Sequence, residues 1–551
     1  MKQILSVIIL ATLAVPLAGQ TAADAFRFSE NIYEGTARTV AMGNAFTALG
    51  GDLGSIGINP AGSAVANYSQ VTITPGLTIS SSTCYGNPAG ETTYFEQIMK
   101  NKKTAFTLPN VAATFNLNLG SKRGLKNVTF GFAVNRTNDY GQNVFAIGTN
   151  DKTSYLGSMA YWATMDGVYA GDLTASNRWE TQPWRYVIGH RTGMIATLGD
   201  DYSYIGATED FENVGTEENP YYNIFTPGQL EQSYNRMVSG EKYEYAFNVA
   251  FNISDKLYLG VNLVGTSLSY AYEHYFKEVS VNPADFEYEA GGKIYQFDKM
   301  KYSTFYDATG SGFYGKIGAI FTPGLGLRIG AAIQTPTVMN IRERWYERGE
   351  MSTQITATSN SETSPEGETS YRLVSPFRAN FGLAWTFGRF GVISADYEFS
   401  NYRQMKYTGS RDLDSEFLMA LNTEIRNSYA TSHLFRAGVE LKPLSVLALR
   451  AGYAINSPSL KSEINFKDAD GRGPGTRFCK QAVSFGIGFA SKGSFFADLT
   501  AQKIFYPTEY YMPYDPYVFD EANNELAGYY VPEIVIKPRQ WKVMLTLGWR
   551  F

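Results

Sequence analysis

Apolar and polar side chains alternate along one segment after another of this chain, and the alternation constrains the fold more than any other feature. In the segment 243–253 the odd-numbered residues are aromatic or aliphatic, while the residues between them are small or polar. The segment 541–551 repeats the pattern and ends on Phe551. Because successive side chains of a strand point to opposite faces, each such segment predicts a strand between an apolar and a polar environment.

Counting these segments predicts about fourteen strands, each long enough to cross a membrane, for which a tilted strand needs ~9–11 residues. We expect the strands at 68–80, 110–120, 127–137, 241–253, 256–273, 309–322, 325–336, 371–387, 389–402, 432–442, 445–457, 481–490, 494–506 and 538–551. An even number of strands returns both ends of the barrel wall to the same side of the membrane.

The predicted connections alternate in length. Short turns at one end and long loops at the other are typical of outer-membrane barrels. Long loops are expected at 81–109, 138–240, 274–308, 337–370, 403–431, 458–480 and 507–537. The predicted fold class is all-β, a transmembrane antiparallel β-barrel with long outer loops. The alternative is a soluble protein with several sheets, which would not sort its loops so regularly.

Composition agrees with a barrel and excludes several other classes. The aromatic fraction is 15% and the mean hydropathy is −0.22, and beyond the N-terminus no apolar run approaches the ~18 residues of a membrane helix. The net charge of −5 gives no support for a nucleic-acid partner. Cys84 and Cys479 are the two cysteines, too few for a disulfide framework or a metal cluster. Both fall in predicted outer loops, where they could pair or remain isolated thiols.

Both ends of the chain indicate export to a bacterial outer membrane. Lys2 and the apolar stretch 4–15, followed by small residues, predict a secretory signal peptide over 1–23. A single membrane anchor is disfavoured by the short length of the stretch and by Pro16. The terminal Phe551 is similar to the signal that the outer-membrane assembly machinery reads, so we expect that machinery as a partner during biogenesis.

The segment 24–67 lacks strand-like alternation and is rich in glycine and other small residues. A barrel of about fourteen strands lies between the ~8-stranded barrels that side chains fill and the ~16-stranded barrels that hold an aqueous channel. We therefore expect 24–67 to form a plug inside a barrel formed by 68–551. Charged residues on the lumen side of the predicted strands would pair with one another or bond to this plug. They are Arg378, Asp396, Glu398, Arg436, Glu440, Arg450, Asp498 and Arg550.

The same segment resembles the N-terminal hatch of the FadL/TodX family of outer-membrane transporters, which carry long-chain fatty acids and other hydrophobic compounds. The matching residues are Ala37-Arg38, Met42 through Phe46, Asp52 and Asn59-Pro60-Ala61-Gly62. The resemblance implies passive uptake of hydrophobic small molecules through a barrel gated by its hatch, with release into membrane lipid. The hatch and ligand positions that it implies are Phe26, Phe28, Arg38, Met42, Asn44, Asn59, Pro60 and Ala61. A defect in the barrel wall would lie at Gly131 or Asn135 in the third strand.

No feature of the sequence indicates an enzyme, a cofactor or a metal site. Gly310 through Gly315 match a dinucleotide-binding pattern but precede a strand instead of opening a helix. His190, His274 and His433 lack metal-ligand spacing. The apolar residues of the loop 138–240 are expected to pack as a lid or to form a landing groove. The alternative functions are a partner-binding component of protein secretion or surface attachment, and a general porin.

Overall fold

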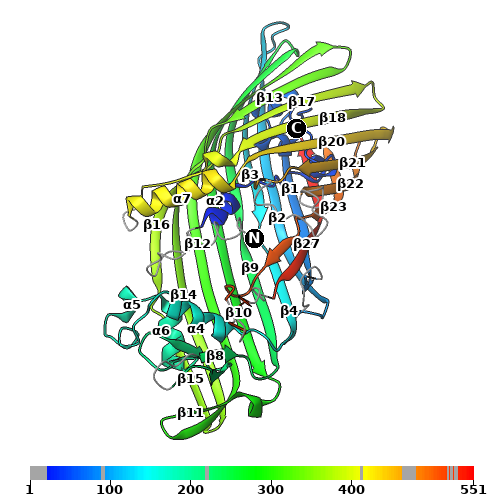
Figure 1. Cartoon of the computed structure of the whole chain (residues 1–551). Helices are drawn as coiled ribbons and strands as arrows, with labels where there is room; N and C mark the ends of the chain where they lie inside the picture. The colour runs from blue at the N-terminus through cyan, green and yellow to red at the C-terminus, as the bar shows by residue number, and fades with distance from the viewer. Residues whose placement is uncertain are drawn as a thin grey trace.

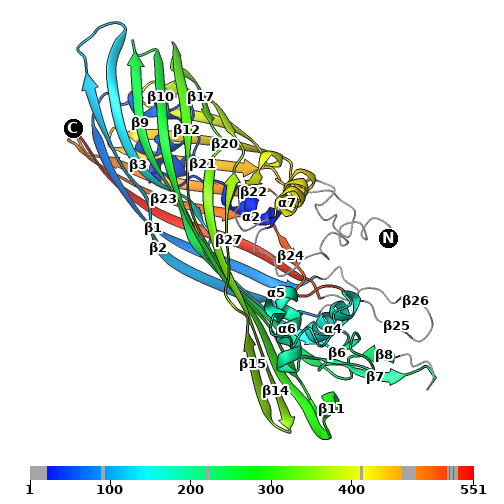
Figure 2. The same ribbon diagram turned by 90° about the vertical axis from the view of Figure 1, so that its left-hand side faces the viewer.

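The computed structural model describes residues 21–87, 94–216, 222–409, 414–461, 479–517, 520–521, 525–526 and 532–551. Within them the chain forms a closed, antiparallel barrel of 14 strands (Figures 1 and 2). The strands are β1 (Gln70–Gly86), β2 (Met99–Asn118), β3 (Leu125–Asp139), β9 (Leu230–Ile253), β10 (Leu257–Ser280), β12 (Lys293–Gly324), β13 (Leu327–Gln334), β17 (Arg378–Phe387), β18 (Gly391–Asn401), β20 (Thr431–Leu444), β21 (Leu447–Asn456), β22 (Lys480–Ala490), β23 (Phe495–Phe505) and β27 (Ile534–Arg550). The barrel closes because β27 pairs with β1, Trp549 opposite Val71.

A barrel strand is found at each predicted position, but the predicted strand 371–387 is interrupted at 375–377, and several predicted loops are wrong. The segments 81–109, 274–308 and 337–370 were expected to be loops, whereas β1, β2, β10 and β12 continue through much of the first two. The third contains β14 (Val338–Ile355), β15 (Thr358–Thr363) and β16 (Gly367–Val374), which continue the sheet outward beside β12. Outward residues of this extension, such as Arg342 and Glu368, are charged, so the apolar alternation that marks a membrane strand ends before the strand does.

The other outer loops fold into small elements at the end of the barrel opposite the short turns, toward the right and lower right of Figure 2. The loop 138–240 contains β4 (Gln142–Asn150), α4 (Tyr155–Met165), α5 (Arg178–Thr181), α6 (Trp184–Thr192), β5 (Ile195–Thr197), β6 (Tyr204–Gly206), β7 (Asp210–Asn213) and β8 (Tyr222–Phe225). Elsewhere lie η3 (Pro283–Phe286), β11 (Glu287–Ala290), η4 (Tyr402–Gln404), β19 (Lys406–Thr408), α7 (Ser415–Ser428), β24 (Glu509–Tyr511), β25 (Asp520–Glu521) and β26 (Glu525–Leu526). Leu156, Met159 and Ile188 are buried in one core with Phe276 of β10, so the loop packs on the extended strands.

Both cysteines are free thiols. Cys84 lies in β1 and is buried, so its predicted place in an outer loop is wrong. The predicted loop 81–109 misplaced it, because β1 continues as far as Gly86.

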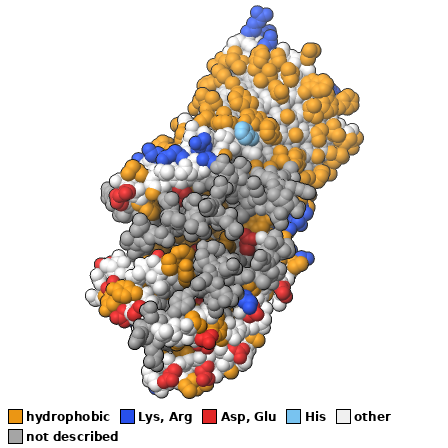
Figure 3. Space-filling model, viewed as in Figure 1, with side chains coloured by type: hydrophobic (Ala, Val, Ile, Leu, Met, Phe, Trp, Pro, Cys, Tyr) orange, Lys and Arg blue, Asp and Glu red, His pale blue; other side chains and the backbone are white. Residues whose placement is uncertain are grey.

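Aliphatic and aromatic side chains cover the outer face of the barrel near the short turns (Figure 3). Outward residues of this belt include Phe115, Phe247, Leu263, Phe313, Leu383, Phe435 and Phe485, each more than half exposed. Such a band on a closed barrel is the lipid-facing surface of an outer-membrane protein. No helix among the described residues is long and apolar enough to span a membrane.

The N-terminal segment, residues 21–66, lies in the lumen and fills it (Figure 1). It consists of α2 (Ala22–Ser29), α3 (Ala37–Ala41) and two 3-10 helices, η1 (Leu53–Gly57) and η2 (Pro60–Val65). Side chains start each element: Thr21 caps α2, Thr36 caps α3, Asp52 caps η1 and Asn59 caps η2. Most of the predicted signal peptide, residues 1–20, lies outside the described residues.

Candidate functional site

The N-terminal segment touches the barrel wall backbone to backbone, because glycines of the wall face it. A Cβ added at Gly260 would lie 2.3 Å from the carbonyl carbon of Pro60, and one added at Gly330 would lie 2.1 Å from the carbonyl oxygen of Thr47. We call the wall glycines that approach the N-terminal segment, through its backbone or its side chains, the glycine belt: Gly260, Gly318, Gly330, Gly382, Gly438, Gly452 and Gly486. Several are direct cross-strand partners, including Gly260 with Gly318 and Gly438 with Gly452. The belt seats residues 41–61 against the wall.

Charged wall residues bond to the backbone of the same segment. Lys242 Nζ donates to the carbonyl oxygens of Phe28 at 2.9 Å and Glu30 at 2.7 Å. Lys316 Nζ donates to the Gly57 carbonyl at 2.8 Å, and Asp396 accepts from the Thr47 backbone N–H at 2.7 Å. The prediction that lumen charges pair with one another or bond to the plug is confirmed for Arg378, Asp396, Glu398, Arg436, Glu440, Arg450 and Asp498. Arg550 instead lies over the rings of Tyr68 and Phe496.

A second set of charges lies at the short-turn end of the lumen. Arg38 of α3 donates to Glu440 at 2.8 Å, Glu440 accepts from Arg450 at 2.6 Å, and Arg450 contacts Asp498 at 2.5 Å. A cavity of about 850 Å³ opens below them, among the turns 388–391 and 442–447. The N-terminal segment, including Arg38 and Asp52, lines its inner side. The lumen is therefore blocked between this cavity and the outside.

The wall itself has a gap in its hydrogen-bond ladder. β2 pairs with β3 from Asn118 up to Asn110, which opposes Asn135, and the pairing ends there. Beyond that point β2 still pairs with β1 as far as Met99, but it has no β3 partner. Residues 99–109 of β2 therefore lack a partner on the β3 side only, and we call this stretch the β2–β3 gap. Phe106, on its outer face, is 78% exposed.

The N-terminal segment occupies the β3 edge that β2 leaves. The backbone N–H of Ile32 donates to the Thr137 carbonyl at 2.7 Å, and that of Glu34 donates to the Arg136 carbonyl at 3.1 Å. Glu34 and Arg136 thereby form an isolated antiparallel bridge. After Tyr140 the chain continues as β4, which pairs with β9 and accepts a hydrogen bond from Ser82 of β1 at the Asn143 carbonyl.

A buried ion cluster fixes the bridge. Glu34 contacts Arg136 at 2.8 Å and also contacts Lys542, and all three side chains are at most 2% exposed. Burial alone would raise the pKa of the Glu34 carboxyl, but the charges of Arg136 and Lys542 outweigh burial and lower it. Glu34 is therefore an ionised link between β3, β27 and the N-terminal segment.

Above the N-terminal segment, on the loop side, lies a luminal cavity of about 600 Å³. Its floor includes Phe26, Arg27 and Ile32, and its lining includes Asn138 through Gln142, where β3 passes into β4. The luminal cavity thus adjoins the residues of β3 that the N-terminal segment pairs with. The lining also contains many aromatic side chains: Tyr140, Tyr234, Tyr270, Tyr272, His274, Tyr429, Tyr506 and Tyr511.

The predicted hatch residues are distributed over different environments. Phe26 lines the luminal cavity and stacks on Tyr429, whereas Phe28 is buried against Tyr270. Arg38 lies at the short-turn end. Met42 is buried against Gly438 and Gly452, and Asn44 (φ 61°) donates to the Tyr33 carbonyl.

The Asn59-Pro60-Ala61 turn holds the N-terminal segment against the barrel wall. Asn59 Oδ1 accepts from the Ala61 N–H at 3.1 Å, while its Nδ2 donates to the carbonyls of Thr47 at 2.6 Å and Ala319 at 3.1 Å. Pro60 and Ala61 press against Gly260. For the wall defect, Gly131 lies inside the paired part of β3, and Asn135 is the last paired residue before the gap. The roles of all these residues in transport stay predictions.

The sequence analysis missed the aromatic residues of β9 and β10 that line the luminal cavity. Tyr270, Tyr272 and His274 occupy alternate positions of β10, and Tyr234 and Arg236 occupy alternate positions of β9. Tyr270 and Tyr272 lie inside the predicted strand 256–273, but the prediction followed only its apolar outward residues, whereas His274, Tyr234 and Arg236 lie beyond the predicted bounds at 273 and 241. Continuing the alternation by a few residues would have placed these side chains on the lumen side.

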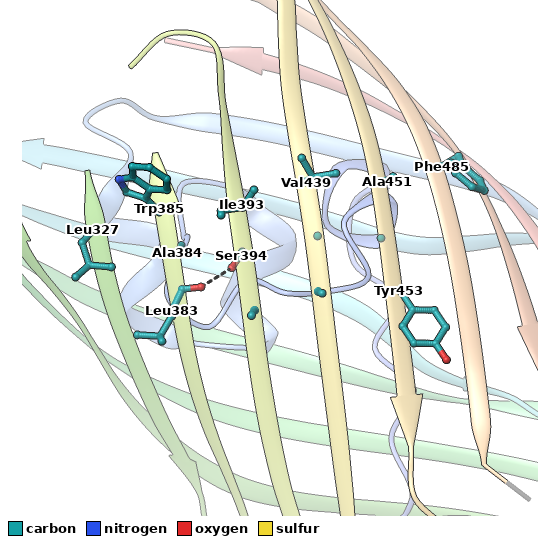
Figure 4. Close-up of a pocket in the computed structure, with 14 residues that line it drawn as sticks. Leu327, Leu383, Ala384, Trp385, Ile393, Ser394, Val439, Ala451, Tyr453 and Phe485 are labelled. Carbon is teal, nitrogen blue, oxygen red and sulfur yellow. Dashed lines mark hydrogen bonds between the residues drawn. The ribbon is translucent and has the colours of Figure 1, made fainter. Parts of the chain in front are cut away.

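A further depression, of about 630 Å³, lies on the outer face of β17 to β22 (Figure 4). Leu327, Trp385 and Ile393 stand at one side and Phe485 at the other, while Ala451 contributes to the shallow part. These outward residues belong to the apolar belt, so the depression faces the membrane interior and is separate from the luminal cavity.

The closed order of strands, the apolar belt and the lumen blocked by the N-terminal segment define the chain as a transmembrane β-barrel of the bacterial outer membrane. A search of solved structures finds similar folds at low sequence identity. They include the toluene transporter TodX of P. putida (11% identity, 94% of this chain and 99% of that chain, TM-score 0.47) and a FadL homologue of Pseudomonas aeruginosa (10%, 94% and 99%, 0.49). The toluene transporter TbuX of Ralstonia pickettii is also similar (12%, 94% and 99%, 0.43). No protein-family model matches the chain, and no curated protein matches it.

Proposed function

We propose that the chain is a FadL/TodX-type transporter that takes up hydrophobic small molecules, long-chain fatty acids among the candidates, by passive diffusion. The observation that carries the proposal is the combination of a blocked lumen with a gap in the wall. A solute that enters the luminal cavity cannot pass the glycine belt, but it lies next to the segment that covers the β2–β3 gap.

The proposed route leads from the outer loops to the luminal cavity and then sideways into the membrane. Its gate is the short stretch 30–36, because those residues pair with β3 where β2 does not. Residues 41–61 stay seated on the glycine belt and keep the lumen closed to ions. Release into lipid suits an apolar solute, since each methylene that leaves water contributes about 0.8 kcal/mol. No cofactor or energy source is required.

The gap offers a matched test. Phe106 and Phe115 both lie on the outer face of β2, but Phe106 borders the gap and Phe115 opposes Phe130 in the intact ladder. A charged side chain at the exit would obstruct an apolar solute, while the same change at Phe115 would only disturb the lipid-facing apolar belt. Uptake of radiolabelled oleate and of toluene should therefore fall several-fold in cells carrying Phe106→Asp and stay near the parent value with Phe115→Asp. Equal uptake in both variants would contradict the lateral route.

The alternatives remain a partner-binding component of protein secretion or surface attachment and a general porin. The sheet formed by β14, β15 and β16 favours the first, because it extends well beyond the apolar belt (Figure 2). Three measurements separate these functions: mass spectrometry of small molecules extracted from the purified protein, recovery of partner proteins, and sugar flux into liposomes. Bound apolar compounds would support transport, stoichiometric recovery of a partner protein would support the scaffold role, and size-limited sugar flux would support the porin.

A further inference from the structure

The luminal cavity differs in chemistry from an aliphatic binding site. Among its lining residues the aliphatic side chains are few, chiefly Ile32 and Val238. Tyrosine is the commonest residue type in the lining: Tyr234 of β9, Tyr270 and Tyr272 of β10, Tyr511 of β24, and Tyr140, Tyr429 and Tyr506, which follow β3, α7 and β23. A saturated chain would gain burial here but would meet hydroxyl groups along its length.

The rings present stacking surfaces at several points. Phe26 and Tyr429 are stacked with centroids 5.3 Å apart, Tyr234 and Tyr511 at 4.5 Å, and Tyr272 and His274 at 5.5 Å. Aromatic pairs prefer such offset or edge-on arrangements, which contribute beyond their buried area. A planar ligand can therefore extend these stacks within a space of about 600 Å³.

The charges of the cavity are already neutralised by neighbours. Arg27 pairs with Asp24, and Arg236 contacts Glu509 at 2.7 Å. The remaining acids pair as well: Glu30 contacts Lys480, and Asp139 contacts Arg136 at 3.4 Å. Arg539 is exposed and lies over the ring of Phe505. A ligand carboxylate would have to compete with Asp24 for Arg27 and with Glu509 for Arg236, or reach the exposed Arg539, and burying an unpaired charge is costly.

Polar groups that could bond to a neutral ligand do remain. The hydroxyls of Tyr270, Tyr272 and Tyr429 make no hydrogen bond to another residue in the described ranges, although each lines the cavity. Buried Nε of Arg236 also lacks a hydrogen-bond partner among the described residues. These donors and acceptors lie among ring faces.

We infer that the preferred ligand of the luminal cavity is a neutral aromatic compound carrying hydroxyl or carbonyl groups, and neither a fatty acid nor a bare hydrocarbon. The inference rests on the proposed function, since it names the solute class of that site. The rings supply stacking, the free hydroxyls supply directional bonds, and the paired charges disfavour an anion.

Binding to the purified full-length chain in detergent tests the inference with four probes of graded polarity: biphenyl, 4-phenylphenol, biphenyl-4-carboxylate and palmitate. We expect 4-phenylphenol to bind about two- to tenfold more tightly than biphenyl, the range for one net hydrogen bond. The carboxylate and palmitate should bind more weakly than 4-phenylphenol. Palmitate or biphenyl binding as tightly as 4-phenylphenol would overturn the inference.

Two variants on β10 locate the effect. Tyr272→Phe removes one of the three free hydroxyls from the cavity and should reduce the preference for 4-phenylphenol while leaving biphenyl binding unchanged. Tyr275→Phe is the control, because Tyr275 lies on the same strand, faces outward and contacts Lys301. A preference that survives Tyr272→Phe unchanged would also overturn the assignment.

The uptake assay keeps this result separate from the proposed function. Uptake of oleate or toluene that depends on Phe106, together with tight palmitate binding, would refute only the ligand class. Absence of uptake of every probe, with binding of none, would refute transport itself.

Discussion

The glycine belt gives a sharp prediction about gating, because one added methyl group can be placed either against the N-terminal segment or into open space on the same strand. Gly260 faces Pro60 and Ala61, and an added Cβ would lie 2.3 and 2.4 Å from their backbone atoms. Gly265, also on β10, has no heavy atom within 4 Å of an added Cβ. Neither glycine has a positive φ. Gly260→Ala and Gly265→Ala therefore differ in packing and not in the backbone effect of replacing glycine.

The expected magnitude follows from the overlap. Ordinary carbon contacts need about 3.5 Å, so the N-terminal segment or the strand must move by more than 1 Å at Gly260. Overpacking of this kind costs typically about 1–3 kcal/mol. We call residues 41–61 seated when they lie against the glycine belt and unseated when they have left it. If the cost falls on the seated state, the unseated population rises about five- to hundredfold, since 1.4 kcal/mol is a factor of ten.

Ion conductance across planar bilayers measures the unseated state, because unseating opens the lumen. We expect frequent conducting events with Gly260→Ala and the closed baseline of the parent with Gly265→Ala. Circular dichroism should show an intact barrel for both. Indistinguishable traces from two folded variants would refute the claim that the belt seats the segment.

Three further perturbations have defined expectations. Glu34→Gln leaves the buried Lys542 without its carboxylate partner and removes the nearest carboxylate of Arg136, which keeps Asp139 at 3.4 Å, so the stretch 30–36 should lose about 3–5 kcal/mol of stability, measured as faster hydrogen exchange there. Asn59→Ala removes the cap of η2 and the bond to the Thr47 carbonyl, at a cost of about 1–3 kcal/mol, measured as faster exchange over 45–65. Burial raises the pKa of Glu209 in the outer loop from 4.5 to about 7, so the loop should lose stability as pH rises from 5 to 8, and Glu209→Gln should remove that dependence in thermal unfolding of the loop.

Each expectation has a contrary result. Unchanged exchange of 30–36 in Glu34→Gln would mean that the ion cluster does not hold the bridge. An Asn59→Ala variant with parental exchange would show that the belt alone fixes the turn. Loop stability that increases with pH would contradict the sign for Glu209, whose folded state retains a proton that the unfolded state loses above about pH 4.5.

Much of the barrel could be predicted because the membrane imposes a rule on every crossing segment. Where a strand faces lipid on one side, as at Phe247 and Leu263, the outward residues must be apolar, and alternation marks the strand. Above the membrane the rule lapses. Outward positions such as Arg342 and Asp307 can be charged, so β14 and the upper part of β12 resemble loops in the sequence.

The site was less predictable because it depends on contacts between distant segments. Both Gly131 and Asn135 are residue types found where a strand is interrupted. The pairing of β3 with β2, which the sequence does not give, ends at Asn135. The glycine belt did carry a signal, since Gly260, Gly318 and Gly330 occupy inward positions of consecutive strands. The sequence did not show that these glycines face residues 41–61, because that segment lies about two hundred or more residues earlier in the chain.

The central claim is that the barrel is closed to ions by its own N-terminal segment while its wall provides the exit. Bilayer conductance of the full chain and of a variant lacking residues 24–67 tests it most directly. We predict a closed baseline for the full chain and a stable, ohmic conductance for the folded deletion variant. The same low conductance from both proteins would contradict the account, because the lumen would then be blocked by something other than this segment.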